Sequence, residues 1–205
     1  MEGHCIVTGM TGCGKSRWVV STLRGPMKGK FNTIILICPT YAYNKTYRDF
    51  AKGDPGFLAL APDASDEGEL NDILQLCSTV YDDNRAKTLF IVDDCSFSRD
   101  VKKRSSEIVR LFCSGRHLGI SIYLLTQQYT SVAKVLRDNC SFVVAFHNPS
   151  GKDFDSLLDS CGSSLPVQER EKLRTAMKEH KFSRLCFSLR FPYEIMLEIP
   201  AVSLS

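Results

Sequence analysis

The residues best suited to chemistry lie near the start of the sequence, where residues 9–16 read GMTGCGKS. This G-x-x-x-x-G-K-S spacing is typical of a P-loop, in which glycines let backbone N–H groups close around phosphate oxygens. An apolar run precedes the motif and a helical pattern follows it, so the start of a helix would add its dipole to phosphate binding. The predicted phosphate site consists of Gly9, Met10, Thr11, Gly12, Cys13, Gly14, Lys15, Ser16 and Arg17.

Two side chains of this loop have predicted roles of their own. Lys15 is expected to reach the β- and γ-phosphates of ATP, and the Ser16 hydroxyl to hold Mg²⁺. A second Gly-Lys pair, Gly151-Lys152, lacks the loop spacing, and we assign it no phosphate. ATP and Mg²⁺ are therefore the predicted cofactors.

A pair of carboxylates follows the apolar run of the segment LFIVDD, residues 89–94. Ligands of open α/β sheets bind where strands end, so the first acid, Asp93, is expected to hold Mg²⁺ through water. The second acid, Asp94, is placed to orient or deprotonate an attacking water; the alternative is that it only caps the following turn. A doubled acid favours an ATPase that activates water over a kinase that excludes it.

A third polar group follows another buried strand. The run ISIYLLT ends at Thr126, and Gln127 comes next. Gln127 is predicted to sense the γ-phosphate and the attacking water from this edge of the sheet; the alternative is an ordinary loop residue.

The elements that must position these groups are visible as alternating patterns. Apolar runs typical of strands buried on both faces occupy 5–8, 33–38, 88–92, 120–126 and 141–146. Helical periodicity covers 70–81, 101–114 and 130–138, whereas 53–68 is rich in Gly, Pro and acids and predicts a surface loop. This order predicts an α/β fold with a mostly parallel sheet flanked by helices, the P-loop NTPase architecture.

The pattern changes after residue 150. A helix is predicted at 166–180, followed by alternating apolar residues over 185–191 and 195–199. This alternation indicates an antiparallel hairpin at the sheet edge. We therefore expect residues 1–150 to form the ATPase core, and residues 151–205 to add a helical segment and an edge hairpin to the same domain.

The composition of the chain limits the number of domains and the compartment in which the protein is expected to work. A chain of 205 residues suits one domain, and its net charge of +3 permits contact with nucleic acid without arguing for it. No secretory signal or membrane-length apolar run is present, and the nine cysteines form no C-x-x-C pair. We expect an intracellular protein with no membrane contact and reduced thiols, several acting as small core residues: Cys5, Cys38, Cys77 and Cys113.

With P-loop, doubled acid and strand-end Gln in this order, the chain resembles the FtsK–HerA superfamily of P-loop motor ATPases. Within it, the chain is most similar to the genome-packaging ATPases of poxviruses and other large DNA viruses. The resemblance covers about residues 3–147 and is most specific in GRHLGISIYLLTQQ, residues 115–128. It implies an ASCE/RecA-like sheet in which the sensor strand lies between the P-loop and Walker-B strands. Most relatives have Glu where this chain has Asp94, which is one methylene shorter.

The resemblance implies a Mg²⁺-dependent ATPase that assembles into a ring, a pentamer or hexamer, and threads double-stranded DNA into a preformed capsid. It would work at the site of virion assembly, in host cytoplasm or nucleus, or associated with the virion, with capsid vertex proteins as further candidate partners. DNA contacts are expected from Lys102, Lys103 and Arg104 or from the aromatic and basic run at 41–50. The alternative is that both are solvated helix faces.

Arg116 is the candidate for a residue that completes a neighbouring subunit's site. It precedes the strand that ends at Gln127, and seven residues of strand span about 23 Å, so it should lie at the opposite sheet edge. From there it could reach only another subunit's phosphates. The alternative is a cap of the preceding helix. Arg99, Arg104 and Arg110 are weaker candidates.

Three other functions remain open at this point. A nucleoside kinase of the thymidine-kinase type would share the P-loop, although such kinases carry zinc-binding C-x-x-C pairs. An FtsK–HerA-type motor could move another DNA or a protein cargo. A nucleotide-bound scaffold would bind ATP without hydrolysing it.

Overall fold

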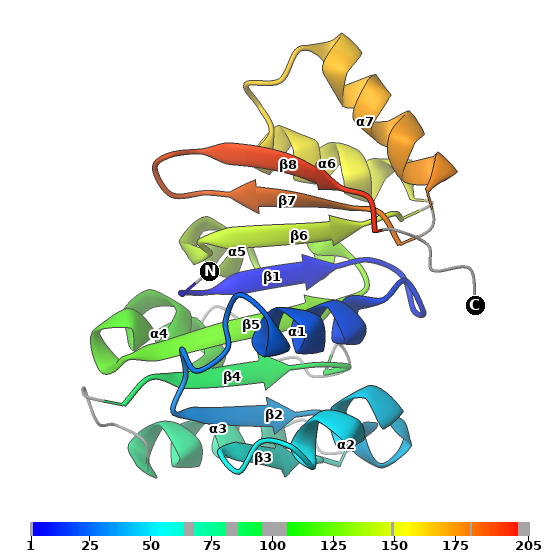
Figure 1. Ribbon diagram of the computed structural model, residues 1–205. Coiled ribbons are helices and arrows are strands. Elements are labelled where there is room, and N and C mark those ends of the chain that lie inside the picture. The colour runs from blue at the N-terminus through cyan, green and yellow to red at the C-terminus, as the bar shows by residue number, and fades with distance from the viewer. Residues whose placement is uncertain are drawn as a thin grey trace.

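The computed structural model describes residues 2–63, 68–80, 86–95, 106–148, 150–180 and 182–200. The strands are β1 (Cys5–Thr8), β2 (Thr33–Ile37), β3 (Phe57–Leu60), β4 (Thr88–Val92), β5 (Ile120–Thr126), β6 (Phe142–Phe146), β7 (Arg184–Ser188) and β8 (Glu194–Glu198). They form one sheet in the order β3-β2-β4-β5-β1-β6-β7-β8 (Figure 1). Strands β1 to β6 are parallel to one another, whereas β7 pairs antiparallel with β6 and β8 pairs antiparallel with β7. The predicted mostly parallel α/β sheet is confirmed.

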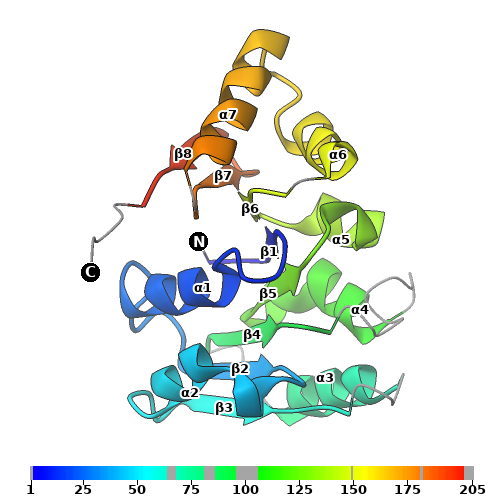
Figure 2. The ribbon, with the colours of Figure 1, turned by 90° about the vertical axis from the view of Figure 1, so that its right-hand side faces the viewer.

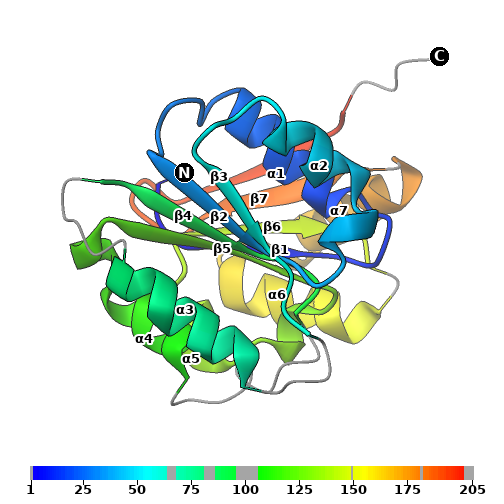
Figure 3. The same ribbon diagram turned by 90° about the horizontal axis from the view of Figure 1, so that it is seen from below.

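Helices cover both faces of this sheet (Figures 2 and 3). One face carries α1 (Lys15–Arg24) and α2 (Lys45–Ala51). The other carries α3 (Glu69–Val80), α4 (Glu107–Ser114), α5 (Lys134–Asn139) and α6 (Gly151–Cys161). Helix α7 (Val167–Glu179) follows at the β7–β8 end of the sheet. None of the helices described here has the length and apolar character that crossing a membrane requires.

The strands form because their side chains are buried on both faces. In β1, Cys5 and Val7 join the core beneath α1 and α2, whereas Ile6 joins the core beneath the helices of the opposite face. Every residue of β4 and β5 is buried in the same way. Each large apolar side chain removed from water contributes about 1.5–3 kcal/mol, so continuous apolar runs are stable only at the centre of such a sheet.

The five strands predicted from apolar runs are present, each within one residue of its expected bounds. The loop predicted for 53–68 is wrong in part, because β3 occupies Phe57–Leu60 and pairs in parallel with β2. This edge strand is only half-buried, and Leu58 is 40% exposed, so it lacks the continuous burial that marks the central strands. Helix α6 falls within the helical segment expected after residue 150, but its bounds had no predicted counterpart.

The carboxyl-terminal predictions are confirmed in type. Helix α7 lies where 166–180 predicted one, and β7 and β8 form the antiparallel edge hairpin. The predicted 130–138 helix is split into a 3-10 turn, η4 (Tyr129–Ser131), and α5. Of the predicted 101–114 helix, α4 covers the second half, and residues 101–105 lie outside the described part of the chain.

The cysteines are free thiols, and most are buried or partly buried. Cys5, Cys38 and Cys77 lie in the core as predicted. Cys113 is exposed, which corrects its expected core position, because it occupies the solvent side of α4.

Candidate functional site

The carboxyl ends of the central strands bring the predicted site residues to one edge of the sheet. In the register, Thr8 of β1 pairs with Thr126 of β5, and Val92 of β4 pairs with Leu124 of β5. The P-loop, the two acids and Gln127 therefore leave three neighbouring strands at the same level, on the edge that faces the viewer in Figure 2. Strand β5 lies between β1 and β4, which is the order that the superfamily resemblance implied.

The P-loop connects β1 to α1 through glycines that adopt left-handed or related backbone angles. Gly9 has φ 150°, and a Cβ there would lie 2.7 Å from Phe146 Cβ and 2.9 Å from Cys13 Sγ, so only glycine fits. Gly14, the N-cap of α1, has φ 103°. Lys15 is 9% exposed, and its Nζ donates to the carbonyl oxygens of Gly9 (2.6 Å) and Met10 (3.1 Å). The ammonium group thus lies directly against the loop, where phosphate charge would need a partner.

The outer side of the loop fits a phosphate chain. Met10, Thr11, Gly12 and Arg17 are exposed, and a Cβ added to Gly12 would meet no atom within 4 Å. Exposed backbone N–H groups at a helix amino terminus favour an anion, as the phosphate-site prediction requires. Cys13 is half-buried, and burial raises the pKa of its thiol, which reduces the fraction present as the reactive thiolate.

Asp93 forms the buried centre of the predicted metal site. It is 2% exposed, and its Oδ2 accepts hydrogen bonds from Ser16 Oγ (2.8 Å) and from the Tyr47 hydroxyl (2.8 Å). Burial raises the pKa of the Asp93 carboxyl, whereas these two donors act in the opposite direction. Ser16 and Asp93 therefore offer two adjacent oxygen ligands, the type that Mg²⁺ takes together with water and phosphate.

Tyr47 is a site residue that the sequence analysis missed. The run at 41–50 was expected either to contact DNA or to form a solvated helix face. Tyr47 and Phe50 are instead buried on the inner side of α2, and burial raises the pKa of the Tyr47 phenol. Their spacing of three residues was a signal of a buried helix stripe. Tyr43, Lys45 and Arg48 are exposed.

Asp94 differs sharply from its neighbour in environment. It is exposed, has a left-handed φ of 57°, and accepts a hydrogen bond from Thr40 Oγ1 at 2.7 Å. Thr40 follows β2, so the acid is oriented from the next strand along the sheet. Asp tolerates this backbone region better than most residues, and strained angles of this kind cluster at functional sites. The arrangement suits a carboxylate that contacts water.

Gln127 is exposed immediately beyond β5, and its backbone is held by a buried network. Asn148 Nδ2 donates to the Gln127 carbonyl (3.3 Å) and to Asp153 Oδ2 (3.2 Å). Asp153, 5% exposed, also accepts from the backbone N–H groups of Tyr129 (3.1 Å) and Thr130 (2.9 Å). Neither Asn148 nor Asp153 was predicted as a site residue, although both fix the loop that carries Gln127.

Arg116 lies at the other edge of the sheet. It belongs to the 3-10 turn η3 (Gly115–Leu118), which leads into the amino end of β5. It lines a cavity of about 200 Å³ there, together with Glu2, Lys87 and Arg190. The structure therefore does not bring Arg116 to the P-loop of its own chain. The position of Arg116 at the opposite sheet edge agrees with the prediction, and its role on another subunit stays a prediction.

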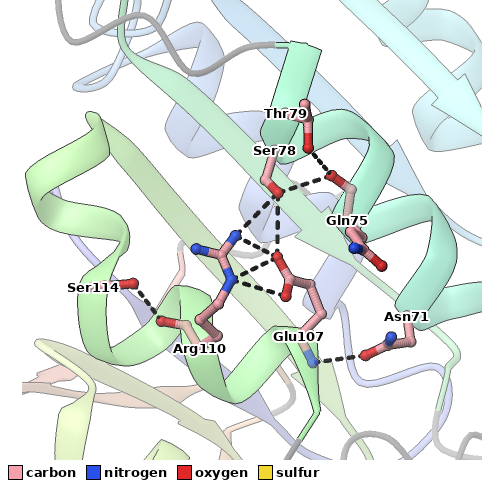
Figure 4. A network of polar contacts seen from close by, with 7 residues as sticks. All are labelled: Asn71, Gln75, Ser78, Thr79, Glu107, Arg110 and Ser114. Carbon is pink, nitrogen blue, oxygen red and sulfur yellow. Dashed lines mark hydrogen bonds and ion pairs between the residues drawn. The ribbon is translucent and has the colours of Figure 1, made fainter.

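Arg110, a weaker candidate for that role, is engaged in a structural network between α3 and α4 (Figure 4). Its Nε donates to both carboxylate oxygens of Glu107 (2.9 and 2.8 Å), and its Nη2 donates to Ser78 Oγ (3.2 Å). The Glu107 backbone N–H in turn donates to Asn71 Oδ1. The other arginine candidates and the DNA contacts proposed at 102–104 lie outside the described residues: Arg99, Lys102, Lys103 and Arg104.

Solved structures of viral and bacterial ATPases resemble this fold. B204, the DNA-packaging ATPase from Sulfolobus Turreted Icosahedral Virus, superposes with a TM-score of 0.71 at 13% identity, over 98% of this chain and 99% of that chain. B204 from Sulfolobus turreted icosahedral virus 2, in complex with ATP-gammaS, gives 0.68 at 13% identity over 98% of each chain. The cytoplasmic domain of the Thermomonospora curvata Type VII Secretion ATPase EccC gives 0.65 at 15% identity, over 94% of this chain but 25% of that one.

The sequence comparisons identify the family. No curated protein matches the chain. The family model described as "Poxvirus A32 protein" matches residues 2–181, which include the P-loop, both acids, Gln127 and Arg116. The match extends beyond the resemblance seen in the sequence at residues 3–147 and takes in α6 and α7. The chain therefore belongs to the Poxvirus A32 protein family.

Proposed function

We propose that this protein is a viral genome-packaging ATPase, which hydrolyses ATP in a ring of subunits to drive double-stranded DNA into a capsid. The observation that carries the proposal is the convergence of P-loop, Ser16–Asp93 pair, Asp94 and Gln127 on one sheet edge in a member of this family. The fold likeness to the DNA-packaging ATPase B204 from Sulfolobus Turreted Icosahedral Virus supports the cargo. The likeness to B204 from Sulfolobus turreted icosahedral virus 2, solved with ATP-gammaS, supports the nucleotide.

Each of these residues has a separate proposed role in ATP hydrolysis. Lys15 and the loop N–H groups bind the phosphates and offset their charge. Ser16 and Asp93 would hold Mg²⁺, which neutralises charge on the β- and γ-phosphates when bound. Asp94 orients a water for attack on the γ-phosphorus and accepts its proton as the bond to the β-γ bridging oxygen breaks. Gln127, on its braced loop, positions that water.

The DNA and ring parts of the proposal rest on charge and placement. Arg17 and Arg24 of α1 and Lys45 at the start of α2 line an open groove on one face, beside Asp49. A basic groove next to the nucleotide site suits a polyanion whose grip changes with nucleotide state. Arg116, at the opposite sheet edge, would enter the site of the adjacent subunit.

The test is ATPase rate against the concentration of double-stranded DNA. The proposal predicts hydrolysis that rises with DNA, no phosphate transfer to thymidine, and loss of turnover in Lys15→Ala. Lys152→Ala is the matched control, because Lys152 is an exposed lysine after glycine at the start of another helix. Hydrolysis indifferent to DNA would favour another cargo, as in EccC-like secretion ATPases. An active Lys15→Ala protein would overturn the phosphate site.

A further inference from the structure

An aromatic ring lies beside the P-loop on the side away from the catalytic acids. A Cβ built on Gly14 would lie 3.5 Å from Phe182 Cδ1 and 3.7 Å from Phe146 Cε1, so both rings flank this part of the loop. Phe146 is 2% exposed and belongs to the core, but Phe182 is 41% exposed. Figures 1 and 2 show that the end of α7 and the start of β7, between which Phe182 lies, share the sheet edge with the P-loop.

The backbone of Phe182 adopts a strained conformation. Phe182 has φ 66°, a left-handed angle that is rare for a bulky residue. The next residue, Ser183, is fully buried and anchors the turn: its Oγ donates to the Met177 carbonyl (3.2 Å) and its N–H to the His180 carbonyl (3.1 Å). Strain that surrounding contacts enforce is a reason to look for a function at the strained residue.

The direction of a bound nucleotide follows from the sheet order. The γ-phosphate end must lie near Asp93 and Asp94, which follow β4, two strands from β1 on the β5 side. Phe146 and Phe182 belong to β6 and to the entry of β7, on the other side of β1. A triphosphate lying along the P-loop between these two sides therefore directs its nucleoside toward the phenylalanines.

We propose that Phe182 is the platform on which the base of the bound nucleotide stacks. The inference rests on the proposed function, since the ligand is the nucleotide that the P-loop holds. A half-exposed phenyl ring offers a flat apolar face, which suits a purine base. It offers no hydrogen bond to the base edge, so this platform discriminates little between adenine and guanine.

The experiment compares a ligand that has a base with one that lacks it. Isothermal titration calorimetry measures the Kd of AMPPCP and of inorganic tripolyphosphate, each with Mg²⁺, for the wild-type chain, Phe182→Ala and Phe182→Trp. Phe182→Ala should weaken AMPPCP binding by about 5- to 160-fold, which corresponds to the loss of about 1–3 kcal/mol when an aromatic partner of a base is removed. Tripolyphosphate binding should not change, and Phe182→Trp should retain AMPPCP binding.

Phe191→Ala is the matched control. Phe191 is 89% exposed and follows β7 at the sheet edge opposite the P-loop, so its loss should leave both Kd values unchanged. Equal weakening of both ligands in Phe182→Ala would overturn the base platform and reduce Phe182 to a support of the loop. An unchanged AMPPCP affinity in that variant would overturn it as well. A wild-type chain that binds neither ligand would overturn the phosphate site itself, which is a distinguishable failure.

Discussion

Removing the Tyr47 hydroxyl tests whether this buried group holds the Walker-B carboxylate in place. Tyr47→Phe deletes one oxygen from a residue that is 0% exposed and leaves the ring in its packed position. The lost bond is a 2.8 Å contact to Asp93 Oδ2, and Asp93 is itself 2% exposed, so water cannot replace the donor. Hydrogen bonds to charged groups contribute about 1.5–3 kcal/mol. We expect the free energy of unfolding to fall by about this amount at neutral pH.

The fall in the free energy of unfolding caused by Tyr47→Phe should depend on pH. Tyr47 stabilises the ionised form of Asp93 and thereby opposes the rise in the carboxyl pKa that burial causes. Its contribution is therefore greatest above the folded-state pKa of Asp93 and falls as the pH drops through that value. Urea unfolding of the nucleotide-free chain, at neutral pH and near pH 4, measures both free energies.

A double-mutant cycle isolates the interaction energy between Tyr47 and Asp93. Tyr47→Phe, Asp93→Ala and their combination should show a coupling energy of about 1–2 kcal/mol. Tyr129→Phe is the control. Tyr129 is equally buried, but its hydroxyl contacts Cys161 Sγ, at 3.5 Å, and Ser160 in place of a carboxylate, so its loss should cost less and vary little with pH. Additive effects in the cycle, or a Tyr47→Phe cost no larger than that of Tyr129→Phe, would refute the reasoning.

The remaining predictions concern catalysis, acid stability and subunit contact. Asp94→Asn should keep nucleotide binding and reduce the hydrolysis rate by about 10²- to 10⁴-fold, because the acid is expected to contact the attacking water and not the ground-state ligand. Asp94→Glu should retain some turnover. An Asp94→Glu chain as inactive as Asp94→Asn would point to another base. Burial, with nearby arginines, lowers the pKa of His4 to about 4, so the stability it contributes is fully present above pH 6.5 and is lost as pH falls toward 4. His4→Gln should remove about 2 kcal/mol of the difference in unfolding free energy between pH 7 and pH 4.5, and an unchanged acid slope would contradict this. Arg116→Ala should bind ATP but barely hydrolyse it. Mixing it with the inactive Lys15→Ala chain should restore ATP hydrolysis if the arginine acts on a neighbouring subunit. Absence of hydrolysis in mixed rings that are shown to form would refute that role.

Local patterns in the sequence were enough to predict the central sheet and to place the candidate site residues at its edge. A P-loop is a contiguous motif, and strands buried on both faces appear as unbroken apolar runs, so β1, β4 and β5 could be located without knowing their partners. Asp93 and Gln127 follow such runs directly. The strand order that brings them together came from a family resemblance, because pairing between distant strands leaves no local signal.

Tertiary structure alone decided what surrounds those groups. Tyr47 meets Asp93 across 46 residues of sequence, and Asn148 reaches the Gln127 carbonyl from the end of another strand. The β3 edge strand escaped prediction because its short apolar run, FLAL, stands among Gly, Pro and acidic residues that indicate a loop. Phe182 is an unremarkable residue in the sequence, and it lies beside Gly14 only because β7 pairs with β6 and brings the end of α7 to the P-loop edge. Contacts between distant segments depend on the packing of the whole sheet, and this is why no pattern of neighbouring residues could have specified them.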